Sequence, residues 1–224
     1  MMNDRKTSEY CYVSNHSPQW QVVDLLIWKL IPSRFGGGKR YIQKFKDAWV
    51  KHNKTFIRDS AVNNNLPVEL LVGVCWIEVG GDPGFIDRVA FEVRAFDWSG
   101  PDAVDNYLTI TNRAERTSFG SVSIQIRTAA NTLGLDISEM STAQVRTLSH
   151  CLEGDIYNIE IVARHLRQLA DHDNFYPPLN MEQIRIIGAR YNRGIELSLE
   201  SIKRNTSYGD FIVHHWEHFG QLIR

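Results

Sequence analysis

The chain has 224 residues, of which 43% are hydrophobic, so it is long enough to bury one sizeable core or two small ones. Its 25 basic and 26 acidic residues give a net charge of −1, which argues against a nucleic-acid partner. The longest apolar run, residues 22–31, contains Asp24 and Lys29 and is too short to span a bilayer. The first twelve residues lack the apolar stretch and cleavage site of a secretory signal, so we expect synthesis in the cytoplasm and no membrane insertion.

The three cysteines, Cys11, Cys75 and Cys151, are odd in number and widely spaced. This arrangement argues against a disulfide framework and against a thiolate zinc site, and we expect Cys75 to be a small core residue. Several basic residues cluster near the N-terminus with hydrophobic residues between them, which predicts the solvated face of a helix. They are Lys39, Arg40, Lys44, Lys46, Lys51 and Lys54.

Residues 32–41, PSRFGGGKRY, predict a flexible joint. They do not form a phosphate-binding loop, because Ser33 stands at the first glycine and Arg40 stands where Ser or Thr is required. We therefore expect an N-terminal helical arm and joint over residues 1–38 and a main domain over residues 39–224. Beyond the joint, apolar residues recur at helical spacing through residues 40–62.

Residues 66–79 predict a helix that is apolar on most sides and therefore buried. Asn64 or Asn65 is a candidate cap, and Gly80 and Gly81 end the helix. Glu78 then lies in the last turn, where the helix dipole and poor solvation disfavour its ionised form. Such a carboxyl is suited to act as a general acid, unless it points into solvent or pairs with an arginine.

The middle of the chain, about residues 85–122, is irregular and rich in Gly, Asp, Arg and aromatic residues. Residues 122–134 predict a short strand or turn that leads into a helix ending at Gly134. Further amphipathic helices are predicted over residues 155–172, 180–192 and 210–223. The pattern therefore predicts an all-α fold with a small irregular or β patch in the middle.

Four motifs occur in an order that resembles the lysozyme-like superfamily of lytic transglycosylases and goose-type lysozymes. They are the helix of residues 66–79, TSFGSVSIQIRTAANTLG (117–134), DIYNIEIVARHL (155–166) and ARYNRG (189–194). The resemblance covers roughly residues 60 to 195. It implies a lysozyme-like, α+β fold and a peptidoglycan substrate, cleaved at the bond between N-acetylmuramic acid and N-acetylglucosamine.

The resemblance also implies roles for individual residues. Glu78 matches the catalytic glutamate, and Tyr191 and Asn192 match residues beside the sugar cleft, although Asn192 would also suit a helix cap. The second motif places substrate contacts at Ser118, Gly120, Ser123 and Gln125. Val79 replaces the usual serine and Ser123 the usual glutamine, and the stretch between Glu78 and Gly120 is longer than the family pattern.

The longer middle segment contains several acids. A hydrolase needs a second carboxylate to position water or to attack the sugar, whereas a lytic transglycosylase does not. Asp97, and after it Glu92, are the candidates, because both lie among aromatic residues in FEVRAFDWSG. A solvated loop is the alternative for each of them.

Two other classes of function fit parts of the sequence. His214, Glu217 and His218 match H-x-x-E-H, a zinc peptidase signature, but a third ligand would have to come from upstream, and histidines packed among aromatic residues are the alternative. We therefore assign no metal and no cofactor. A non-catalytic peptidoglycan- or protein-binding module is the second alternative, supported by the departures at Val79 and Ser123.

Without a visible signal, an enzyme acting on the periplasm or cell wall requires delivery. The resemblance suggests an antibacterial effector, a toxin injected by a secretion apparatus, or a phage-type lysin. For an effector, the implied partners are an immunity protein and a secretion carrier, besides the glycan strands of peptidoglycan.

Overall fold

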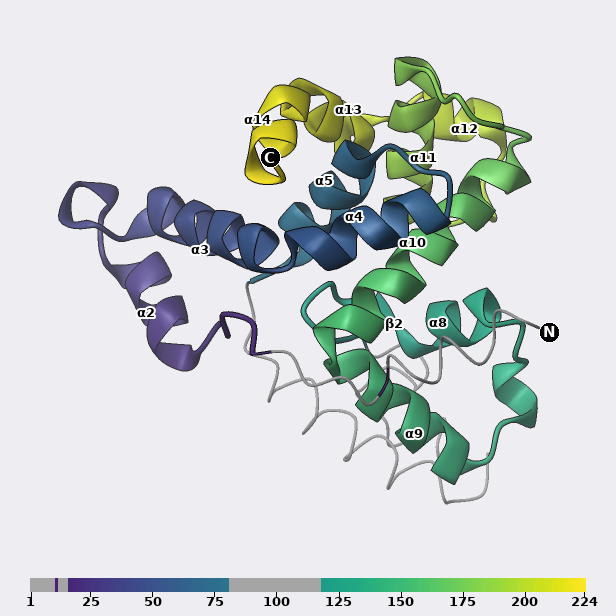
Figure 1. Ribbon diagram of the computed structural model, residues 1–224, viewed down its shortest axis with the longest axis horizontal. Coiled ribbons are helices and arrows are strands. Elements are labelled where there is room, and N and C mark those ends of the chain that lie inside the picture. The colour runs from purple at the N-terminus through teal and green to yellow at the C-terminus, as the bar shows by residue number, and fades with distance from the viewer. Residues whose placement is uncertain (1–10, 12–15, 81–117) are drawn as a thin grey trace, which may run out of the picture.

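The computed structural model describes residues 11, 16–80 and 118–224 (Figure 1). Within these residues the chain is mostly helical, with eleven α-helices and a two-stranded antiparallel sheet, which confirms the predicted helical fold with a small β patch. The helices are α2 (Val22–Leu30), α3 (Gly38–His52), α4 (Lys54–Asn63), α5 (Val68–Glu78), α8 (Ile126–Thr132), α9 (Thr142–Glu153), α10 (Asp155–His172), α11 (Met181–Arg193), α12 (Leu199–Lys203), α13 (Ser207–His214) and α14 (Trp216–Leu222).

Helix α10 is the central element. It packs against α4, α5, α8, α9 and α11, and Figure 1 shows it running from the part with α8 and α9 towards the part with α11 and α12. Nearly all of its first half is buried, and Ile159, Ile161 and Leu166 are fully buried. Its bounds match the predicted helix, because the amphipathic pattern of residues 155–172 is long and regular.

Helix α5 is enclosed on all sides by α3, α4, α10, α11, α13 and α14. The seven residues from Leu70 to Trp76 are all buried, as the apolar sequence predicts. Pro67 rather than an asparagine occupies the N-cap, since Asn65 adopts a positive φ in the preceding turn. The helix ends at Glu78, and Gly80 follows with a φ of 80°.

The small sheet pairs β1 (Ser118–Phe119) with β2 (Ile124–Gln125), with Ser118 opposite Gln125. Helix α8 follows β2 directly, and the turn at Gly134 comes soon after its end, as predicted. The short 3₁₀ helix η3 (Ile137–Glu139) then leads to α9, which Ser141 caps with Gln144 in a reciprocal pair of hydrogen bonds.

The segment predicted to be a flexible joint forms a turn that contains a short 3₁₀ helix. The 3₁₀ helix η1 (Ser33–Phe35) and the following glycines reverse the chain, so that α2 and α3 form a helical hairpin that projects from the rest of the molecule (Figure 1). The ring of Trp20 packs against Tyr41 and Phe45 of α3, with centroids 6.0 and 4.8 Å apart. Aromatic contacts therefore hold the hairpin together.

Two predicted helices are each divided in the structure. The helical pattern of residues 40–62 breaks at Asn53, which is fully buried and bonds to Ser17 and to the Trp49 carbonyl. The C-terminal pattern breaks at His215, whose ring stacks on Trp76 of α5 with centroids 6.4 Å apart. In both places, tertiary contacts of a polar or aromatic side chain override the helical spacing.

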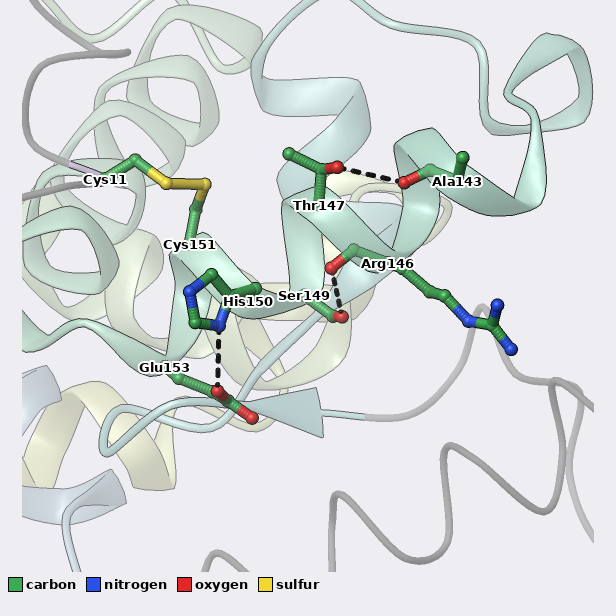
Figure 2. Close-up of a disulfide and its surroundings, with 8 residues drawn as sticks. All are labelled: Cys11, Ala143, Arg146, Thr147, Ser149, His150, Cys151 and Glu153. Carbon is green, nitrogen blue, oxygen red and sulfur yellow. Dashed lines mark hydrogen bonds and ion pairs between the residues drawn. A yellow bond between two sulfur atoms is a disulfide. The ribbon is translucent and has the colours of Figure 1, made fainter.

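A disulfide joins Cys11 to Cys151 of α9, which are 140 positions apart (Figure 2). The count and spacing of the cysteines argued against a disulfide framework and did not predict this bridge, because a single long-range bridge needs neither close spacing nor an even number of cysteines. Cys75 is free and fully buried in α5, which confirms its predicted place in the core. Burial raises the pKa of its thiol well above the usual range.

No helix among the described residues is long and apolar enough to cross a membrane.

Candidate functional site

Glu78 lies at the C-terminal end of α5, where the apolar helix meets α13. Its Oε1 accepts a hydrogen bond of 2.7 Å from the hydroxyl of Tyr208. Burial raises the pKa of Glu78 above its ordinary value, and the Tyr208 hydrogen bond and the charge of Lys46 oppose this shift without cancelling it. The structure therefore gives Glu78 the raised proton affinity that the sequence predicts.

Aromatic rings form one wall beside this carboxyl. Tyr208 lies next to Tyr191 of α11, with centroids 6.0 Å apart, and Tyr191 lies 5.9 Å from the ring of His165. Burial raises the pKa of both tyrosines well above the usual range, with the Glu78 charge adding to the effect. Burial also lowers the pKa of His165 to about 4. At neutral pH this wall is therefore uncharged, and Tyr208 keeps the proton that it donates to Glu78.

Lys46 of α3 is the cation that acts on Glu78. Its Nζ donates hydrogen bonds to the carbonyls of Trp76 (2.8 Å) and Ile77 (2.6 Å), in the last turn of α5. Desolvation lowers the pKa of Lys46 to about 8, with the Glu78 charge opposing the shift. The prediction of a solvated face was wrong for Lys46, which is 8% exposed, because it satisfies carbonyls that the helix end leaves unpaired.

Asp47, the next residue of α3, holds the side chain of Trp76. Its Oδ1 accepts a 2.7 Å hydrogen bond from the Trp76 indole N–H and lies 3.1 Å from Nε2 of His218. The face of Trp76 stacks on Phe211, with centroids 5.7 Å apart. Consecutive residues of α3 therefore fix the backbone and the side chain of α5 directly before Glu78.

The H-x-x-E-H residues do not share one helix. His214 ends α13 and is exposed, whereas His218 lies on α14 beyond the break at His215 and contacts Asp47. In the part of the chain that the structure describes, no three His, Cys, Asp or Glu side chains gather closely enough to hold a metal ion. The structure thus places these histidines among aromatic and acidic neighbours.

The predicted substrate contacts of the second motif lie together on the β hairpin. Ser118 is in β1, Gln125 ends β2, and Ser123 is exposed in the turn with a φ of 32°. Gly120 has a φ of 76°, and a Cβ there would lie 2.2 Å from the Leu152 carbonyl oxygen. Only glycine fits this contact, so its place in the motif has a steric reason independent of substrate.

Asn158 of α10 fixes the hairpin from beneath. Its Nδ2 donates to the Phe119 carbonyl (3.2 Å) and its Oδ1 accepts from the Val122 amide (2.9 Å). The hairpin is thereby held against α10, whereas Glu78 and Tyr191 belong to the wall formed by α5, α11 and α13. The motif residues therefore lie in two parts of the fold, the β hairpin and the wall of α5, α11 and α13. Helix α10 is a neighbour of both.

Asn192 is exposed and lies within the last turn of α11, next to Tyr191. The cap position belongs to Gly194, which has a φ of 82°. Asn192 therefore does not serve as the helix cap that its spacing allowed. The two acids proposed as a second carboxylate, Asp97 and Glu92, lie outside the described residues.

Sequence reasoning missed Tyr208 and Lys46 as neighbours of Glu78. One signal for Tyr208 is the adjacent Gly209, where a Cβ would lie 2.0 Å from the Arg185 carbonyl oxygen of α11. Gly188 of α11 faces it, with a Cβ position 2.8 Å from the Gly209 Cα. These two small residues let α13 approach α11 closely enough to bring Tyr208 to Glu78.

Comparison with family models, with curated proteins and with solved structures gives no match to this chain. A carboxyl with raised proton affinity, next to a neutral hydroxyl donor and a nearby ammonium group, is equipped to release a proton to a substrate oxygen and to remain stable as the anion.

Proposed function

We propose that the protein is a glycosidase that cleaves peptidoglycan, a muramidase or a lytic transglycosylase, with Glu78 as general acid. The observation that carries the proposal is the environment of Glu78, whose carboxyl lies at the end of a buried helix and whose pKa is raised by burial. Cleavage of a glycosidic bond requires protonation of a poor leaving oxygen, which a carboxylic acid held neutral can supply.

The surroundings of Glu78 suit both the protonated carboxyl before the transfer and the carboxylate that forms after it. Before transfer, burial favours the protonated form of the carboxyl. As the proton moves to the glycosidic oxygen and the C–O bond breaks, the carboxylate that forms accepts the Tyr208 hydrogen bond and interacts with the Lys46 charge. These two groups favour the anion, so they act mainly when the leaving group departs.

Tyr191 and Asn192 are the proposed sugar contacts next to this acid, and Ser118, Gly120, Ser123 and Gln125 are those on the β hairpin. For the second step we favour hydrolysis, with Asp97, or less so Glu92, positioning water or attacking the sugar. Mass spectrometry of digested murein tests this step. Muropeptides with reducing ends support hydrolysis, whereas products lighter by one water indicate transglycosylation and leave Asp97 without a chemical role.

The test of the catalytic assignment is turnover of purified murein by the Glu78→Gln variant. Loss of a general acid should lower the rate by at least ~10²-fold while the circular dichroism spectrum stays unchanged. Glu69→Gln is a matched control, because Glu69 lies on the same helix at its opposite end. Activity of Glu78→Gln close to wild type would remove Glu78 from the mechanism.

A non-catalytic peptidoglycan- or protein-binding module is the alternative favoured by Val79 and Ser123. It predicts that the wild-type protein sediments with insoluble murein but releases no soluble product, and that Glu78→Gln binds equally well. Release of muropeptides by wild type alone rejects it.

A zinc peptidase that uses His214 and His218 is a further alternative. It requires stoichiometric zinc in the purified protein and activity that a chelator abolishes. The glycosidase proposal expects murein turnover that a chelator leaves unchanged, and His218→Ala should then affect stability, through the Asp47 contact, more than turnover.

We further propose that the protein is made in the cytoplasm and acts in the periplasm or cell wall, as an antibacterial effector or a phage-type lysin. The Cys11–Cys151 disulfide supports an oxidising destination, since such bonds persist mainly outside the cytoplasm. An effector would have an immunity protein and a secretion carrier as partners. Co-purification from a strain carrying the neighbouring genes tests for both.

A further inference from the structure

The helical hairpin of α2 and α3 presents an apolar ridge to solvent. Along α2 the exposed apolar side chains are Val22, Val23, Leu26 and Leu30, each 46–70% exposed, and three of them recur at four-residue spacing. At the tip of the hairpin, Ile31 and Phe35 are also exposed, at 40% and 70%. Contiguous apolar side chains of this kind on a projecting element indicate an interaction surface.

The contacts beneath the ridge keep it facing outwards. Asp24 of α2 accepts a 2.5 Å hydrogen bond from the Tyr41 hydroxyl and a 2.8 Å bond from the Gln21 amide. Trp20 packs on Phe45 of α3. The side of α2 that faces α3 is thus already occupied by these contacts. The apolar side chains of the ridge therefore remain exposed in the folded protein.

The hairpin is strongly basic although the chain as a whole is not. Residues 20–45 contain five cations and one acid, Asp24, whereas the whole chain has a net charge of −1. The cations are Lys29, Arg34, Lys39, Arg40 and Lys44, and all five are exposed. The Nζ of Lys29 lies 3.8 Å from the ring centre of Trp28, and the guanidinium of Arg34 lies 4.8 Å from that of Phe35.

We infer that this hairpin docks the protein on an anionic phospholipid surface. An apolar ridge bordered by lysine and arginine is the pattern of segments that lie in a membrane interface, with aliphatic groups among the acyl chains and cations at the headgroups. Aromatic rings paired with cations suit the same boundary, since one part is apolar and the other charged.

The length of α2 defines the mode of binding. Nine helical residues extend about 14 Å, less than half of the ~30 Å hydrocarbon thickness, so the hairpin lies in one leaflet and does not span the bilayer.

The positive charge of the hairpin and its apolar ridge together favour an anionic lipid surface over other binding partners. A second copy of the chain would bring two basic hairpins together, and like charges repel. A glycan strand offers hydroxyl and acetamido groups but no apolar interior in which Leu30 and Phe35 could be buried. An anionic membrane complements both the charge and the apolar ridge, and this inference does not depend on the chemistry of Glu78.

Co-sedimentation of the full chain with sucrose-loaded vesicles tests the inference. Vesicles of phosphatidylcholine with 30% phosphatidylglycerol should bind the protein, and vesicles of phosphatidylcholine alone should bind it at least ~10-fold more weakly. Leu30→Ser with Phe35→Ser should weaken binding by at least ~10-fold, because two apolar side chains no longer leave water. Arg34→Ala with Lys39→Ala should weaken it ~10-fold or more and reduce its salt dependence.

Matched controls come from exposed residues elsewhere. Val62→Ser removes an aliphatic side chain that is 67% exposed on α4, and Arg58→Ala with Arg204→Ala removes two exposed cations outside the hairpin. Both should bind as wild type does. All four variants change exposed side chains, so folding is expected to persist, and unchanged melting curves verify it.

Equal binding by the hairpin variants and by wild type would overturn the inference, as would equal binding to the two kinds of vesicle. Analytical ultracentrifugation distinguishes self-association. A wild-type dimer that the Leu30→Ser and Phe35→Ser changes convert to a monomer, without vesicle binding, would assign the ridge to a second copy.

Discussion

The hydroxyl of Tyr208 donates a 2.7 Å hydrogen bond to Oε1 of Glu78, which lies 130 positions earlier in the chain. The pair joins α13 to the end of α5 at the carboxyl that we propose as the general acid. The donor is itself buried and neutral at physiological pH, so Tyr208 keeps the proton that it donates to Glu78.

The change Tyr208→Phe removes this donor and leaves the ring. The hydrogen bond lowers the pKa of Glu78, so its loss should raise that pKa. A general acid must be protonated, and the fall in activity on the alkaline side should therefore move to higher pH. We expect kcat to fall by about 10-fold, since the bond to the developing anion is lost. The pH profile of murein turnover measures both effects.

Tyr157→Phe is the matched control, because Tyr157 is a buried tyrosine of α10. It should leave the alkaline side of the profile in place. A Tyr208→Phe profile that coincides with wild type, or that moves to lower pH, would contradict the proposed role.

The change Lys46→Met tests the cation near the site. Its charge lowers the pKa of Glu78, so we expect the alkaline fall in activity to move to higher pH, in the same direction as for Tyr208→Phe. Lys44→Met, which alters an exposed lysine of the same helix, should have no such effect. Identical pH profiles for the two lysine variants would show that the buried ammonium group does not influence the acid.

The change Glu78→Gln should raise thermal stability in a pH-dependent manner. Because the folded-state pKa of Glu78 is raised, the stability linked to its proton is fully present below the unfolded-state pKa of about 4.3. It is lost as pH rises through the folded-state pKa, whereas glutamine does not titrate. The variant should therefore unfold at a higher temperature than wild type at pH 7. The increase should be about 2–4 °C for each kcal/mol by which the substitution raises the free energy of unfolding.

Differential scanning calorimetry from pH 4 to pH 8 measures this difference. The two melting temperatures should converge towards pH 4. A difference in melting temperature that is constant over this pH range, or a variant that is less stable at pH 7, would contradict the prediction. Either result would show that the ionised Glu78 does not destabilise the folded protein.

Reduction of the disulfide should destabilise the protein. A bridge between residues 140 positions apart restricts the unfolded chain strongly, and its loss typically costs about 2–4 kcal/mol. We expect a clear fall in the melting temperature when dithiothreitol is added. The Cys11→Ser variant should melt at the lower temperature with or without reductant, and a reductant effect of equal size in that variant would exclude this bridge as its cause.

Much of the helical framework follows from local sequence. The helix of residues 155–172 has a long amphipathic pattern, and Asn180 and Gly194 bound α11 through cap chemistry that operates within a few residues. Glu78 was identifiable for the same reason, since the apolar residues before it and the glycines after it fix its place at a buried helix end.

The remaining features depend on contacts between distant segments. Lys46 resembles its exposed neighbours in sequence, and only the carbonyls of α5, 30 positions away, give it a buried partner. The breaks at Asn53 and His215 likewise depend on Ser17 and on the ring of Trp76. No local pattern links Tyr208 to Glu78, because the Gly188–Gly209 approach that joins them is a property of helix packing.

The Cys11–Cys151 bridge closes a covalent ring that includes Glu78, while Tyr191 and Tyr208 lie beyond it. A protease that cuts any single peptide bond between these cysteines opens the ring without releasing a fragment. Glu78 would then still be attached to the part of the chain that carries its hydrogen-bond donor. An oxidised protein among the proteases of a cell envelope could thus be nicked once within this ring and still keep the two pieces together.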